Sequence, residues 1–112
     1  MTQTLSYFPG QLVTIFLEVK TIDGYRADSL TVPMVTRIIF PGFTLASGYP
    51  SAMTNLDTGL YYAQFTIPTG ATAVGSYLVD VAYTNPTTSI INYEIYQVVV
   101  TAPFGNFGTT SG

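Results

Sequence analysis

The feature that most constrains the fold of this chain is a regular alternation of apolar and polar residues, broken at short intervals by glycine and proline. Over residues 12–20, every second side chain from Val13 to Val19 is apolar, which places these side chains on one face of an extended chain. Such a pattern is typical of a half-buried antiparallel strand. No window of helical length repeats apolar residues at three- and four-residue spacing without a glycine or proline inside it. We therefore expect an all-β fold without a substantial helix.

Strands of the same kind are expected along the rest of the chain, because the alternation recurs between turn signals such as Pro-Gly and Asp-Gly. The expected ranges are residues 5–8, 12–20, 34–40, 52–55, 60–67, 77–83 and 90–101, with a short edge piece at 43–45. About seven strands at this spacing predict a single immunoglobulin-like Greek-key β-sandwich of antiparallel strands, and a small barrel is the alternative. The length of 112 residues suits one domain. We place it at residues 1–101 and expect residues 102–112 to form an extended C-terminal tail that contacts a partner.

The composition excludes most kinds of chemical site. The chain contains no cysteine and no histidine, so thiol catalysis and cysteine-ligated zinc are excluded, and the commonest general base and metal ligand is missing. We therefore predict that the protein is not an enzyme and binds no cofactor or metal. Lys20, Arg26 and Arg37 are the only cations, too few for the basic stripe that nucleic-acid binding requires. No stretch reaches the roughly 18 apolar residues of a membrane span, so neither a nucleic acid nor a membrane is an expected partner.

The low charge favours contact with other large molecules. Only 8% of the residues are charged, so the exposed surface is expected to consist of neutral polar side chains and tyrosine. A freely diffusing monomer normally carries more charge, whereas a neutral, tyrosine-rich surface suits contact with proteins or sugars.

The stretch DTGLYYAQFTIP, residues 57–68, has two interpretations. Asp57 is either a working carboxylate or part of a tight corner that leads into a strand. We favour the corner: Gly59 allows the bend, Asp57 accepts from backbone amides two or three residues on, and Tyr61 buries its ring while its hydroxyl bonds back to the corner. Gly75 and Tyr77 repeat the glycine–tyrosine pair one strand later. These five residues are therefore expected to be structural.

The run that joins the two pairs carries a resemblance. Gly-Leu-Tyr at residues 59–61, Phe-Thr-Ile-Pro at 65–68 and Val-Gly-Ser-Tyr-Leu-Val-Asp-Val at 74–81 follow one another. This order resembles the immunoglobulin-like domains of macroglobulin and bacterial surface type, in which a G-x-Y strand ends in an apolar-Pro step before a second G-x-Y strand. The resemblance covers residues 8–100, and it implies a fold without implying a particular activity.

The context of the domain carries a second resemblance. The chain begins with Met1, shows no secretory signal, enters its first expected strand within five residues and ends shortly after the last, so we expect a complete one-domain product. A low-charge protein of this kind resembles the small accessory proteins of tailed-phage virions, capsid decoration (cement) proteins in particular. That resemblance implies a non-enzymatic structural protein on the capsid surface, which stabilises the shell by binding across the major capsid protein or other virion subunits as a homo-oligomer or lattice-bound copy. The alternative is a carbohydrate-binding or adhesion module of immunoglobulin-like type on a phage tail or cell surface.

Five aromatic side chains are the candidate partner-binding residues: Tyr25, Phe43, Tyr49, Phe104 and Phe107. The first three lie in expected loops, where exposed aromatic side chains contact proteins or sugars, and capping of the sandwich ends is an equally good explanation. The last two lie in the tail and are expected to anchor in a groove of a neighbouring subunit.

The few charges give weaker signals. The loop DGYRAD, residues 23–28, contains two aspartates but lacks the ligand spacing of an EF-hand calcium site. An ordinary turn with an Asp23–Arg26 or Arg26–Asp28 ion pair is expected instead. A pair between Arg37 and Asp80 is compatible with the expected strands but does not follow from the sequence.

Overall fold

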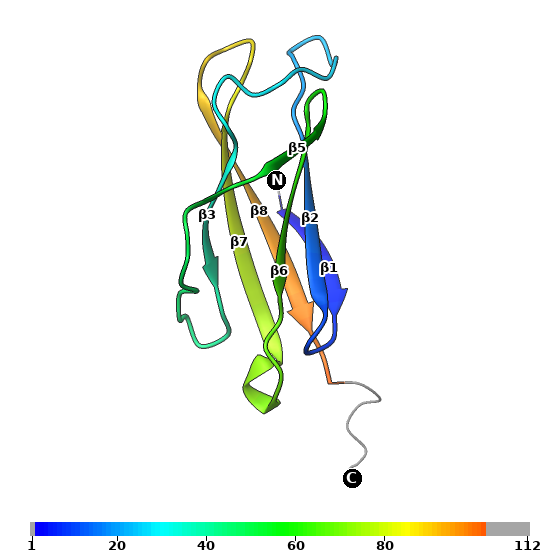
Figure 1. Ribbon diagram of the computed structural model, residues 1–112, viewed down its shortest axis with the longest axis vertical. Coiled ribbons are helices and arrows are strands. Elements are labelled where there is room, and N and C mark those ends of the chain that lie inside the picture. Colours follow the sequence, from blue (N-terminus) through cyan, green and yellow to red (C-terminus); the bar gives the residue numbers. More distant parts are fainter. Residues whose placement is uncertain (1, 103–112) are drawn as a thin grey trace.

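The computed structural model describes residues 2–102, which form eight strands and one short 3₁₀ helix (Figure 1). In chain order these are β1 (Thr2–Tyr7), β2 (Leu12–Glu18), β3 (Met34–Ile39), β4 (Ser51–Ala52), β5 (Thr54–Asp57), β6 (Leu60–Thr66), η1 (Ala71–Ala73), β7 (Gly75–Thr84) and β8 (Ile91–Val100). The described part contains no α-helix, as predicted, and none of its elements is a helix long and apolar enough to cross a membrane.

The strands form two sheets that pack face to face in a sandwich-like arrangement. One sheet has five strands in the order β1-β8-β7-β3-β4, and the other has three in the order β2-β6-β5. Every neighbouring pair is antiparallel except β1 and β8, which are parallel. A β-bulge interrupts the β3–β7 pairing between Val35 and Arg37. The prediction of an all-β fold is confirmed, whereas the expectation of antiparallel strands alone is wrong for the β1–β8 pair.

A single apolar core lies between the sheets. Its buried members come from both sheets and the adjoining loops: Val13, Ile15, Leu17, Val19, Val35, Ile38, Met53, Tyr61, Ile67, Ala73, Tyr77, Val79, Val81, Tyr96, Val98 and Val100. On β2 and β7 these are the alternate residues that the sequence pattern placed on one face, and on β6 Tyr61 is buried while Ala63 and Phe65 of the same face are half-buried. Full burial of one such side chain contributes about 1.5–3 kcal/mol, so the alternation is the main local cause of the fold.

Most strand ends differ from the prediction by one or two residues, and three differences are larger. The expected count of about seven strands is too low, because residues 51–57 form two short strands on different sheets where a single brief pairing was expected. Strand β1 begins at Thr2, since its parallel pairing with β8 extends the hydrogen-bonded segment toward the N-terminus. The edge piece expected at 43–45 is reduced to one bridge between Leu45 and Ile39.

Candidate functional site

The corner at residues 57–61 is held by backbone contacts. The N–H of Gly59 donates to the Asp28 carboxylate at 2.7 Å, and its carbonyl accepts from the N–H of Val19 at 2.7 Å. Gly59 has φ 68, and a β-carbon at this position would lie 2.7 Å from the Val19 carbonyl oxygen and 2.8 Å from the Ala27 nitrogen. Only glycine fits this close approach of three chain segments.

Two hydrogen bonds at this corner differ from the prediction. The Asp57 carboxylate accepts from the adjacent N–H of Thr58 at 2.8 Å, and the corner amide of Gly59 is taken by Asp28 from a distant loop. The ring of Tyr61 is buried, but its hydroxyl accepts from the N–H of Ser29 at 3.1 Å instead of bonding back to the preceding corner. The corner therefore fastens the loop before β3 onto the start of β6.

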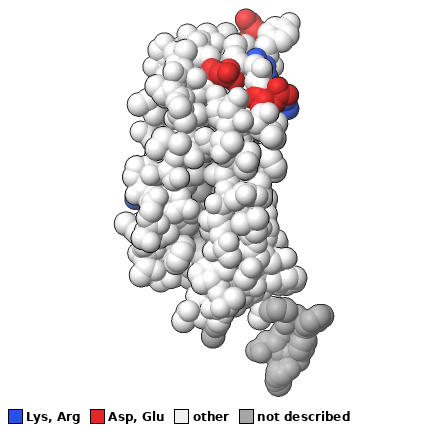
Figure 2. All heavy atoms as spheres, in the orientation of Figure 1, with Lys and Arg blue, Asp and Glu red and all other residues white. Residues whose placement is uncertain are grey.

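The second glycine–tyrosine pair makes the local bond that was expected of the first. The buried hydroxyl of Tyr77 donates to the carbonyl of Ala73 at 2.7 Å, four residues earlier in η1. Its ring packs edge-on against Phe40, with 5.2 Å between the ring centroids. Gly75 has φ 139, and a β-carbon there would lie 3.0 Å from the side chain of Pro41. These contacts close one end of the sandwich and give both residues a structural role. We call it the uncharged end, because most charged side chains lie at the opposite end (Figure 2).

Burial raises the pKa of five tyrosine hydroxyls above the ordinary value of 10: those of Tyr49, Tyr61, Tyr77, Tyr83 and Tyr96. A phenol whose pKa is raised by folding stabilises the fold while it is protonated. That stabilisation is complete below pH 10 and is lost as the pH rises from there through the folded-state pKa values. We expect alkaline unfolding above pH 10, in which a late step of phenolate absorbance coincides with loss of the far-ultraviolet β-sheet signal. Complete, reversible ionisation near pH 10 with an intact β-sheet signal would contradict this expectation.

The predicted partner-binding residues do not meet in one place. Tyr25 is 74% exposed in the loop that follows β2, and Phe43 is 89% exposed in the turn that follows β3. Phe43 also has φ 64, a left-handed conformation that is rare for a bulky side chain. Tyr49 is half-buried and packs against the core. Phe104 and Phe107 lie outside the described residues.

Most charged side chains gather at one end of the molecule, at the top of Figure 2. There the Glu18 carboxylate contacts Lys20 at 3.4 Å and Arg26 at 2.7 Å, and the Arg26 hydrogen bond is the main cause of its lowered pKa. Arg26 thus pairs with Glu18, not with the expected Asp23 or Asp28. No group of three or more metal-ligating side chains occurs within residues 2–102.

The remaining ion pair lies away from this end. Arg37 on β3 pairs with Asp80, the residue directly opposite it on β7, with 2.5 Å between the nitrogen and oxygen atoms. Arg37 is well exposed, so the pair contributes little to stability. The location of the pair matters more than its energy. It is the only salt bridge found on the outer face of the five-stranded sheet in the described structure.

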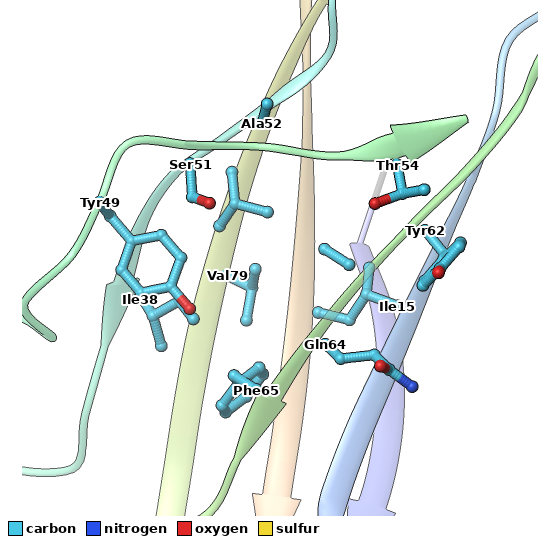
Figure 3. Close-up of a pocket in the computed structure, with 12 residues that line it drawn as sticks. Ile15, Ile38, Tyr49, Ser51, Ala52, Thr54, Tyr62, Gln64, Phe65 and Val79 are labelled. Atoms are coloured by element: carbon cyan, nitrogen blue, oxygen red, sulfur yellow. The ribbon is translucent and has the colours of Figure 1, made fainter. Parts of the chain in front are cut away.

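One side of the sandwich is open between the β3–β4 edge and strand β6 (Figure 3). Two adjoining cavities of about 270 and 420 Å³ lie there, and they share Ile38, Tyr49 and Phe65 as lining residues. We call them together the side groove. The floor of the smaller cavity includes the core residues Ile15 and Val79, so the groove reaches the apolar interior. Of the predicted partner-binding residues that the structure describes, only Tyr49 lies in this groove.

Exposed apolar side chains occur on the outer faces of both sheets. On the three-stranded sheet, Phe16 is 52% exposed and lies directly opposite Tyr62 on β6. On the five-stranded sheet, the exposed outward side chains of β8 are Ile91, Tyr93 and Ile95. The expected surface of neutral polar side chains and tyrosine is therefore wrong for these faces. The sequence did contain the signal, because apolar residues occupy both alternating sets of positions in β8.

Neither protein-family models nor curated protein sequences match this chain. The side groove offers apolar contact and lies beside strand edges, and the two outer faces offer broad apolar contact. Exposed apolar surface of this kind often marks interaction sites on soluble domains.

Proposed function

We propose that the sandwich is of the immunoglobulin-like Greek-key type. The strand order supports this proposal. In that fold the first, second, fourth and fifth strands form one sheet, and the third, sixth and seventh form the other. Taking β1 as the first strand and β4 as an extra edge strand, the sheets β2-β6-β5 and β8-β7-β3 match the second to seventh strands of this pattern, whereas β1 departs from it by pairing in parallel with β8. The bond from Tyr77 to Ala73 adds support, because a tyrosine at this corner bonds a few residues upstream in many such domains.

We propose further that the protein is a non-enzymatic structural subunit that binds a larger protein assembly, most specifically the shell of a virion, as a capsid decoration (cement) protein. The observation that carries this proposal is the apolar outer face of the five-stranded sheet. Tyr93 is 64% exposed there, and Ile91, Ile95 and the half-buried Leu78 lie on the same side. Contiguous exposed apolar surface of this kind marks protein interaction sites on soluble domains.

The proposed mechanism is a clamp. The outer face of β8 and β7 lies on the major capsid protein or another virion subunit, and burial of apolar area holds neighbouring subunits together. The pair between Arg37 and Asp80 is already satisfied within the chain, so covering it leaves no isolated charge. The partner surface is therefore expected to be apolar and poor in charge, and the protein resides on the virion as a lattice-bound copy or homo-oligomer.

The test is binding to shells assembled from the major capsid protein that is encoded in the same genome. Full-length protein is mixed with the shells, and bound copies are measured after sedimentation. We expect wild-type protein to sediment with the shells and Tyr93→Lys to lose at least tenfold in affinity, because a charge is buried without a partner. The control is Ile22→Lys, a similarly exposed apolar residue at the charged end, which should bind as wild type. Absence of the wild-type protein from sedimented shells would contradict the proposal.

A carbohydrate-binding or adhesion module is the second candidate. One observation favours it: the exposed Phe16 on β2 lies directly opposite the half-buried Tyr62 on β6, and beside them Gln64 donates to the Thr14 hydroxyl at 3.1 Å. An aromatic surface fringed by amide and hydroxyl groups suits stacking of a sugar ring. Glycan binding by the isolated monomer, abolished by Phe16→Ala and unaffected by Tyr93→Lys, is the result that this candidate requires.

A further inference from the structure

Strand β6 is paired along only half of one edge. Its partner β5 has the register Thr54↔Tyr62, Asn55↔Tyr61 and Asp57↔Leu60. From residue 63 to residue 66, β6 has no neighbouring strand on this side within the described part of the chain, although β2 pairs with it on the other side along its whole length. The unpaired stretch borders the side groove, since Ala63, Phe65 and Thr66 line its cavities.

The free edge presents main-chain hydrogen-bonding groups. The N–H of Ile67 donates to the carbonyl of Gln11 at 2.9 Å, and the carbonyl of Gly59 accepts from Val19 at 2.7 Å, so the odd-numbered residues of this segment bond toward β2. In an antiparallel pair such bonds fall on alternate residues. Gln64 and Thr66 therefore direct their N–H and C=O groups toward the open edge. These groups form a short template for another strand.

The opposite wall of the groove does not offer such an edge. The N–H of Phe40 donates to the carbonyl of Thr44 at 2.7 Å, and the N–H of Ala46 donates to the carbonyl of Ile38 at 2.9 Å. The loop after β3 thus covers the edge of that strand with its own backbone. An added strand can pair with β6 alone, and its inward side chains then enter the groove between Tyr49, Phe65 and Ile38.

We propose that the C-terminal segment of a second copy, residues 103–112, adds to β6 along residues 63–66 and places a phenylalanine in the side groove. This inference rests on the proposed function, because it specifies how copies join within the assembly. The segment PFGNFGTTSG is uncharged, as are all described residues that line the groove. Phe104 and Phe107 supply apolar side chains, and the larger cavity of about 420 Å³ has room for an aromatic ring. Pairing with a sheet edge is an established mode of peptide recognition.

The position of β8 favours binding of the tail to the groove of a second copy over binding to the groove of its own copy. Strand β8 carries the C-terminal end of the sandwich, and β7 and β3 lie between it and the groove in the five-stranded sheet (Figure 1). A tail binding its own groove has to pass around the corner at residues 67–75. Contact between the tail of one copy and the groove of another joins two different surfaces. It therefore produces a reciprocal dimer, a larger closed ring or an open chain of copies.

The test compares two substitutions at one position of the free edge in the full-length protein. Gln64→Pro removes the outward N–H and fills its place with the proline ring, whereas Gln64→Ala removes the same side chain but retains the N–H. Both lose the hydrogen bond to Thr14, so they differ mainly at the edge. We expect wild type and Gln64→Ala to form an oligomer in light scattering, and Gln64→Pro to dissociate at least tenfold more readily. Thermal unfolding of both variants checks that the fold is retained.

If Gln64→Pro does not fold, a variant of the tail tests the same contact. The double substitution Phe104→Ser and Phe107→Ser leaves the described sandwich unchanged and should give a monomer. In the wild-type oligomer, the amides of Gln64 and Thr66 should exchange with solvent at least tenfold more slowly than in this variant. A wild-type monomer at all concentrations, or an oligomer that persists in the tail variant, overturns the inference. Binding of the protein to shells is measured in the separate experiment with Tyr93→Lys. The oligomeric state of the tail variant therefore does not decide the proposed function.

Discussion

The Gly59→Ala variant is expected to lose about 3–4 kcal/mol of its free energy of unfolding. Gly59 has φ 68, and holding an alanine in this left-handed region costs about 1–2 kcal/mol. The added β-carbon would also stand 2.7 Å from the Val19 carbonyl oxygen and 2.8 Å from the Ala27 nitrogen. To relieve these clashes, the chain segments at residues 19, 27 and 59 have to move apart. This movement weakens two backbone hydrogen bonds, Val19 to Gly59 and Ala27 to Val19, and each weakened bond costs about 1 kcal/mol.

Gly24→Ala is the matched control for this prediction. Gly24 also has a left-handed φ, 88, but no described atom lies within 4 Å of a β-carbon built there. Only the conformational cost applies, so the expected loss is about 1–2 kcal/mol. Urea unfolding followed by circular dichroism gives both values. Equal losses in the two variants would show that the close contacts at Gly59 contribute nothing beyond backbone conformation.

The strands could be predicted from the sequence because their cause is local. In β2 and β7, alternate apolar residues lie on one side of the chain whatever the rest of the molecule does, and burial of that side decides the orientation of the strand. The hydrogen bond of Tyr77 is of similarly short range, since its hydroxyl reaches only four residues back. Local spacing carries enough information for contacts of this range.

The partners at the first corner could not be predicted, because they depend on tertiary placement. Asp28 and Asp57 are equally suitable acceptors for the amide of Gly59, and only the position of the loop before β3 selects Asp28. Similarly, Arg26 has acidic neighbours at Asp23 and Asp28, yet it pairs with Glu18 across the turn that follows β2. Side chains of the same chemistry compete for one partner, and the folded backbone decides among them.

The side groove was hidden for a different reason. It exists because β5 pairs with β6 only as far as Tyr62, and the end of a pairing is not encoded by the alternation of either strand. The apolar outer face of β8 was visible in the sequence, because apolar residues occupy both alternating sets of positions there. A strand that is apolar on both sides, in a sheet with only one covered face, leaves apolar side chains exposed on its outer face, and the proposed function rests on this surface.

The Tyr77→Ala variant is the second substitution with a large expected effect, a loss of about 3–5 kcal/mol. The ring of Tyr77 is 1% exposed and contacts Phe40 and Phe65, so its removal leaves a cavity at the uncharged end. Tyr77→Phe tests the contribution of the hydroxyl separately from that of the ring. It retains the packing but leaves the buried carbonyl of Ala73 without its donor, which costs about 1–3 kcal/mol.

Tyr93→Ala is the control, because Tyr93 lies on β8, next to β7 in the same sheet, but is largely exposed. Its removal should change stability by no more than about 0.5 kcal/mol. In urea unfolding of the three variants, we therefore expect Tyr77→Ala to be the most destabilised, Tyr77→Phe to be intermediate and Tyr93→Ala to be the least destabilised. If Tyr77→Phe unfolds at the same urea concentration as wild type, the hydroxyl does not hold η1 to β7. The closed end of the sandwich then depends on ring packing alone, and the corner at Gly75 is positioned by its contact with Pro41.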